Sequence, residues 1–168
     1  MEKFKTRDLT LMAVLIAVEI VLSRFLSFNA WNMKIGFSFL PAAVAAMMLG
    51  PIAAGIVAAL GDFIGALLFP IGAYFPGFTL TAFLTGISFG VFLSKKQELW
   101  RILASVAINQ LILSLLLNSL WISMLYGSPY LPLLGTRLLQ CAILFPVQFV
   151  SILVLTKSGL ISKLHTIT

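Results

Sequence analysis

Long runs of apolar residues alternate along the chain with short breaks that contain charged, polar, glycine or proline residues. A helix that crosses a bilayer needs about 20 predominantly apolar residues, so this pattern predicts an all-α integral membrane protein, a bundle of six transmembrane helices. We expect one membrane domain over residues 1–168. The predicted spans are residues 8–28, 37–49, 52–69, 78–93, 99–126 and 131–156.

Composition supports a membrane protein, because 61% of the residues are hydrophobic and only 10% are charged. The net charge of +6 does not indicate nucleic-acid binding, since the basic residues lie at the ends of apolar runs and form no continuous stripe. The single cysteine and single histidine predict neither an internal disulfide nor a metal site, and no cofactor is expected. No GxxxxGK[ST] motif is present, so we expect ATP hydrolysis to belong to partner subunits.

Lysine and arginine are distributed asymmetrically between the two sides of this arrangement. They concentrate at the start of the chain, between the fourth and fifth spans, and after the last span, whereas Lys34 lies in an opposite loop. The positive-inside rule then places both termini in the cytoplasm.

Asp62 is the most informative single residue, because it is a carboxylate inside an apolar predicted helix. Charge at membrane depth usually marks a functional site. A GxxxG at 61–65 would let a neighbouring helix approach closely. Arg24 and Arg137 lie near the outer ends of their spans, and Glu19 lies near the middle of the first. These groups predict an outer site for an anionic, aromatic, hydrogen-bonding small molecule.

Several sequence blocks resemble the substrate-binding S-components of energy-coupling factor (ECF) vitamin transporters, most of all the folate-specific members. They are KIGFSFLP at 34–41, LGP at 49–51, GDFIGALLFPIGAYFPGFT at 61–79, and an AxxxA formed by Ala13 and Ala17. The resemblance implies the six-helix S-component fold, like that of riboflavin transporters. It also implies a bacterial cell-membrane protein, not itself an enzyme, that captures a vitamin outside and delivers it through a transmembrane coupling subunit driven by two ATPase subunits.

For a folate carrier, Asp62 is expected to accept hydrogen bonds from the amino group and the adjacent ring NH of the pterin. Arg24, Lys34 or Arg137 would meet the glutamate carboxylates, and Asn118 would orient a polar edge of the ring. Aromatic walls are also expected, and the candidates are Trp31, Tyr74, Phe75 and Trp121. The remaining polar residues of the last two spans are interpreted as interhelical hydrogen-bonding groups: Asn109, Gln110, Gln140 and Gln148.

Other interpretations of the same residues stay open. Asp62 could form a purely structural ion pair with Arg24 or Arg137, and AxxxA could pack within the chain. Arg24 lies seven residues after Ala17 and therefore on nearly the same helix face, which would direct it away from the pocket. An S-component for another vitamin is one alternative function. An autonomous ion-coupled carrier with Asp62 and Glu19 as ion sites is another, and a membrane-embedded enzyme is a third.

Overall fold

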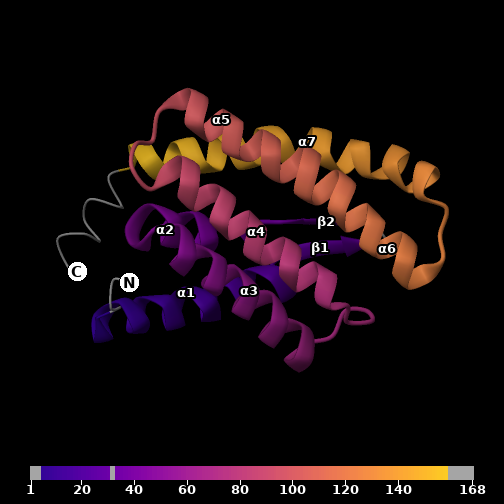
Figure 1. Ribbon diagram of the computed structural model, residues 1–168, viewed down its shortest axis with the longest axis horizontal. Helices are drawn as coiled ribbons and strands as arrows, with labels where there is room; N and C mark the ends of the chain where they lie inside the picture. Colours follow the sequence, from indigo (N-terminus) through magenta and orange to yellow (C-terminus); the bar gives the residue numbers. More distant parts are fainter. Residues whose placement is uncertain (1–4, 31–32, 159–168) are drawn as a thin grey trace.

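Helices dominate the computed structural model. It describes the backbone of residues 5–30 and 33–158, and the side chains of these residues except those within 28–34. In chain order the elements are α1 (Thr6–Arg24), β1 (Ser27–Ala30), β2 (Met33–Gly36), α2 (Phe39–Leu49), α3 (Pro51–Leu68), α4 (Pro76–Leu93), α5 (Leu99–Ala107), the π-helix η1 (Ile108–Leu117), α6 (Asn118–Tyr126) and α7 (Tyr130–Lys157) (Figure 1). Since α5, η1 and α6 follow one another without a break, they form one long helical rod.

Four helical segments in the described residues are long and apolar enough to cross a membrane: α3, α4, the rod Leu99–Tyr126, and α7. Helix α2 is apolar but shorter, at 11 residues. Helix α1 begins and α7 ends at the same end of the bundle (Figure 1).

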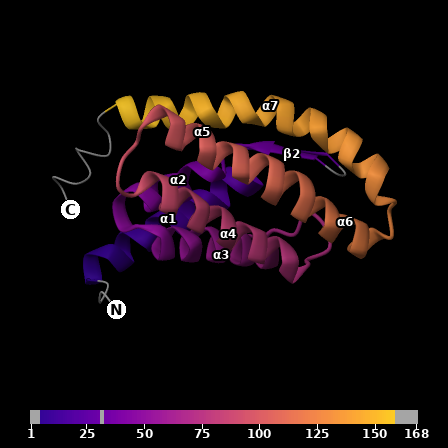
Figure 2. The ribbon, with the colours of Figure 1, turned by 45° about the horizontal axis from the view of Figure 1, so that its top comes forward.

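The predicted first span, 8–28, is wrong at its end. Helix α1 ends at Arg24, and residues 27–30 instead pair antiparallel with residues 33–36, with Ser27 opposite Gly36. The apolar run Phe25–Leu26 continues the helical pattern, but both side chains are more than 60% exposed, so packing does not hold them in a helix. The hairpin supplies backbone partners from residues that a local pattern cannot connect. It packs against α7 (Figure 2).

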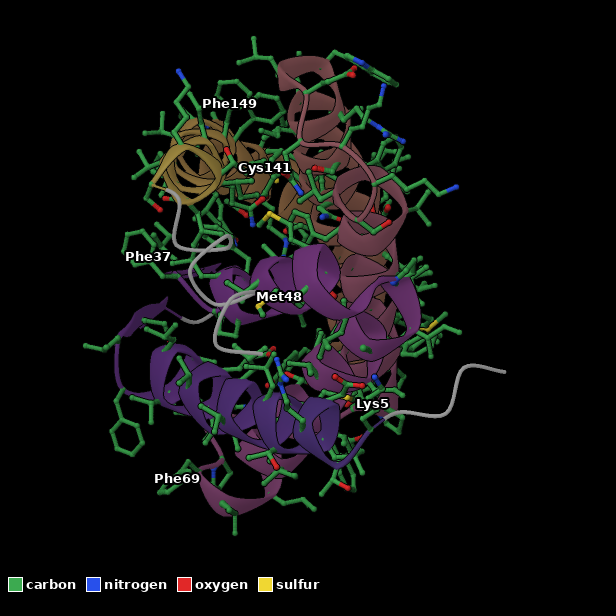
Figure 3. The ribbon with its side chains drawn as sticks, turned by 90° about the vertical axis from the view of Figure 1, so that its left-hand side faces the viewer. Lys5, Phe37, Met48, Phe69, Cys141 and Phe149 are labelled. Carbon is green, nitrogen blue, oxygen red and sulfur yellow. The ribbon has the colours of Figure 1, made fainter. Side chains whose placement is uncertain are left out.

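Close helix contacts depend on small residues, as expected where lipid gives no hydrophobic drive for association. The second GxxxG, Gly86 and Gly90 of α4, lies against the backbones of Ala54 and Pro51 at the start of α3, and a Cβ atom at either glycine would collide with them. Gly50, with φ of 87°, makes the turn between α2 and α3. Helix α2 occupies the middle of the bundle, and Figure 3 shows Met48 between α1 and α7.

Candidate ligand-binding site

A cavity of about 540 Å³ lies inside the helical bundle. Its wall comes from α1, α2, α3, α4, η1, α6 and α7, and from residues 70–74 of the α3–α4 loop. That volume is in the range used by drug-sized ligands. We call the part beside residues 70–74 and Tyr126 the loop end. The inner end is the part bordered by Asn109, Gln110 and Gln148.

Asp62 is at the centre of a polar network near the loop end. Thr79 Oγ1 donates to Asp62 Oδ2 at 3.0 Å, and the hydroxyls of Thr79 and Tyr74 lie 3.2 Å apart. Arg24 Nη2 lies 3.8 Å from Asp62 Oδ1 and donates to the Asp62 carbonyl oxygen at 3.3 Å. Side chains of α1 and α4 therefore hold the carboxylate in place, and its side chain remains 23% exposed.

The GxxxG of α3 explains how α1 reaches this network. A Cβ atom on Gly61 would lie 2.7 Å from Glu19 Cδ, and one on Gly65 would lie 2.9 Å from Arg24 Nε. Both glycines therefore leave room for ionisable side chains of α1. Glu19 is 6% exposed and lines the cavity together with Arg24. Arg24 thus turns inward from the end of α1, although it follows the AxxxA by two turns.

Arg137 lies on the α7 side of the cavity, only 5% exposed. Its Nη2 donates to the Ser114 carbonyl oxygen at 3.2 Å, and one turn further along α7 Cys141 Sγ donates to the Gln110 carbonyl oxygen at 3.3 Å. Figure 3 shows Cys141 on the inner side of α7. These two contacts set the register of α7 against η1.

The predicted aromatic residues are divided between the cavity and the structure behind it. Tyr74 lines the cavity, but Phe75 and Trp121 do not. Their rings pack at an interplanar angle of 42°, with centroids 5.6 Å apart, over Gly77, where a Cβ atom would collide with both. Trp121 Nε1 donates to Thr81 Oγ1 at 3.0 Å. Trp121 therefore positions Thr81, which does border the cavity.

Residues 7–156 match the family model described as ECF transporter, substrate-specific component. The chain belongs to this family. The resemblance found in the sequence is therefore confirmed, and so is the all-α class of the S-component fold, to which the β1–β2 hairpin is an addition. A substrate-specific component is a transport subunit in the membrane and not an enzyme.

Two relatives of this S-component are named as folate transporters. It is 43% identical over 149 residues to "Folate transporter FolT" of Clostridium novyi (strain NT), covering 88% of this chain and 87% of that protein. It is 32% identical over 153 residues to the protein of the same name from Leuconostoc mesenteroides subsp. mesenteroides, covering 87% and 82%. A solved structure, "Crystal structure of FolT bound with folic acid", superposes with a TM-score of 0.87 at 38% identity, covering 92% of this chain and 95% of that one.

The remaining predicted positions lie elsewhere. In the S-component, Ala13 and Ala17 are exposed on α1, away from the cavity. Trp31 lies outside the described residues, and the side chain of Lys34 is also not described. Asn118 lines the cavity, as Asp62, Arg24, Arg137 and Tyr74 do.

Sequence reasoning missed the amides as cavity residues. Asn109, Gln110, Gln140 and Gln148 all border the cavity. Among the described residues, no hydrogen-bond partner contacts either polar atom of the Asn109 side chain, Oε1 of Gln110 or Oε1 of Gln148. Their interpretation as interhelical hydrogen-bonding groups is therefore wrong for Asn109. Their concentration, together with Asn118, in otherwise apolar helices is the sequence signal that could have indicated a polar cavity wall.

Proposed function

We propose that this S-component captures folate with high affinity on the outer side of a bacterial cell membrane and delivers it through a transmembrane coupling subunit driven by two ATPase subunits. The observation that carries the proposal is the cavity itself. It combines the Arg24–Asp62 pair, a second buried arginine and several amides, a set suited to a ligand with carboxylates and a hydrogen-bonding ring. The folate transporters named among its relatives support the choice of ligand.

Asp62 is the proposed acceptor for the amino group and ring NH of the pterin. A carboxylate has about four acceptor positions, and Thr79 uses one of them on Oδ2. Further positions can therefore take ligand donors while Thr79 and Arg24 hold the orientation. Bonds of this kind, with an ionised acceptor, are roughly twice as strong as neutral ones.

The glutamate carboxylates of folate require cations, and we assign them to Arg24, Lys34 or Arg137. A guanidinium is suited to this task because its planar fork matches a carboxylate. Asn118 and Tyr74 would contact the ring or the linker, together with Trp31. Phe75 and Trp121 would act indirectly, because they pack over Gly77 and Trp121 holds Thr81 at the cavity wall. Direct contact of either ring with the ligand would require a rearrangement on binding.

The coupling subunit is assigned to the face of α1 that contains Ala13 and Ala17. Both residues are exposed, and small residues four apart give a flat surface on which another helix can pack closely. We orient the chain so that both termini lie in the cytoplasm, in agreement with the distribution of lysine and arginine.

Isothermal titration calorimetry on the detergent-solubilised protein tests the ligand assignment. We expect tight folate binding without ATP, sodium or a pH gradient, because the site is already formed in the isolated chain. Riboflavin and thiamine serve as matched vitamin controls and should not bind. Binding that requires sodium or low pH would favour the ion-coupled carrier, and tight binding of another vitamin would replace folate.

A further inference from the structure

The middle of the rod Leu99–Tyr126 is wound as a π-helix over η1, and this winding changes which side chains face the cavity. π-helices are rare and frequently occur at functional sites. In an α-helix the nine steps from Asn109 to Asn118 make about two and a half turns, so the two side chains would point in opposite directions. With i→i+5 bonding and about 4.4 residues per turn they make about two turns, so both point the same way. Both asparagines border the cavity.

Asn109 has the properties of a ligand-contacting group. Its side chain is 3% exposed, borders the cavity, and has no hydrogen-bond partner for Nδ2 or Oδ1 among the described residues. Leaving a buried amide without a partner destabilises a protein, so such an arrangement requires an explanation. Gln110, 2% exposed, and Gln148, 7% exposed, add an Oε1 each in the same condition.

These amides lie further from the loop end than Arg137 does. Gln148 follows Arg137 by eleven positions on α7, about 16 Å along the axis. The contact between Cys141 and Gln110 places the start of η1 beside the middle of α7, one turn further from the loop end than the contact between Arg137 and Ser114. The inner end is therefore bordered by neutral groups that both donate and accept.

We propose that η1 turns Asn109 into the cavity and that Asn109, with Gln110 and Gln148, forms an inner subsite for an uncharged, flat heterocyclic group. The inference rests on the proposed function and assigns the pterin's carbonyl and ring nitrogens to these amides. A carboxylate such as Asp62 accepts only, so it cannot serve those acceptors, whereas an amide NH₂ can. Asn109 is then a residue that determines specificity for the ring.

Cysteine labelling tests the winding without any ligand. In a Cys141→Ser background, which removes the single native thiol but keeps a donor for the Gln110 carbonyl oxygen, we compare Asn109→Cys, Asn118→Cys and Ile112→Cys. A small hydrophilic thiol reagent should label positions 109 and 118 but not 112, because Ile112 is 50% exposed on the outer surface of the bundle, which we assign to lipid. Labelling at 118 without labelling at 109 would show α-helical winding and overturn the proposal. This pattern does not depend on folate, so it separates failure of the inference from failure of the proposed function.

Affinity measurements test the ligand contact. Asn109→Leu has nearly the same shape but no polar atoms, and it should weaken folate and pteroate alike by about tenfold or more. Ile112→Ala, in the same helix segment, should bind both as the wild type does. Folate should also protect a cysteine at 109 from the reagent. Wild-type affinity in Asn109→Leu, or no protection at 109, would remove Asn109 from the binding site.

Discussion

Replacing Asp62 with Asn preserves the size of the side chain but removes its charge and turns one acceptor position into a donor. Asp62 accepts from Thr79 at 3.0 Å and pairs with Arg24 at 3.8 Å. In the proposed complex it also accepts two hydrogen bonds from the pterin. Asp62→Asn therefore affects both the ligand and the position of Arg24.

The size of the effect follows from these contacts. A hydrogen bond to a charged group contributes about 1.5–3 kcal/mol, and an unsatisfied donor facing the ring adds a cost of similar size. Because the Asp62 side chain is 23% exposed, water relieves part of this cost. We expect a loss of about 2–3 kcal/mol in binding, which is about 30- to 150-fold in Kd. Because the ion pair is long, at 3.8 Å, and Asp62 is partly exposed, we expect the loss of folding stability to be only about 1 kcal/mol.

Calorimetry with folate and with pteroate, which lacks the glutamate, provides the measurement. Both ligands should weaken to the same extent, because Asp62 contacts the shared ring. Glu98→Gln is the matched control, since it removes one carboxylate from an exposed pair with Lys96 at 3.7 Å outside the cavity. Normal folate affinity in Asp62→Asn would leave Asp62 as the structural partner of Arg24 and refute the assignment.

Three further predictions concern helix α1 and its contacts. Ala13→Trp should leave folate affinity unchanged but abolish uptake and co-purification with the coupling subunit. Val14 is exposed on a neighbouring face of α1, so Val14→Trp should retain both uptake and co-purification. Loss of folate binding with an intact complex would make AxxxA an internal packing seam. Gly65→Ala should weaken folate binding about tenfold, because the added Cβ would lie 2.9 Å from Arg24 Nε and push against it. Gly135→Ala, whose added Cβ has no atom within 4 Å, should leave the affinity measured by calorimetry unchanged. Equal affinities for the two variants would show that α1 can shift without cost. Arg24→Ala should weaken folate more than pteroate if it binds the glutamate tail, and equal losses would assign that tail to another cation.

The helices could be predicted because each depends on a local property of the chain. Apolar length defined the spans, and Gly50 and Gly127, both with positive φ, lie at breaks that the sequence marks clearly. The hairpin could not be predicted, because residues 25–28 continue an apolar pattern and their alternative depends on pairing with residues 33–36. Non-local pairing of this kind leaves no periodic signal in one short segment.

The site was predictable where charge made it conspicuous. Asp62, Arg24 and Arg137 stand out in apolar helices, and all three border the cavity. Asn109 was not predictable, because the α-helical period places it opposite Asn118 and nothing in the composition announces a π-helix. Trp121 stood out as an aromatic residue, but its role depends on the space that Gly77 leaves.

Helix α1 connects the two proposed functions of the chain, because it contributes to both surfaces. Its exposed face carries Ala13 and Ala17. Glu19 lies on its buried side and Arg24 turns inward from its end, and both reach the cavity through the gaps at Gly61 and Gly65. A partner that packs on the alanine face would therefore contact a helix whose far end holds the Asp62 carboxylate. Any tilt of α1 relative to α3 changes the 3.8 Å separation of Arg24 and Asp62, since each side chain is fixed to a different helix. If the coupling subunit packs on the alanine face as proposed, its binding and the retention of the ligand would be mechanically linked through α1.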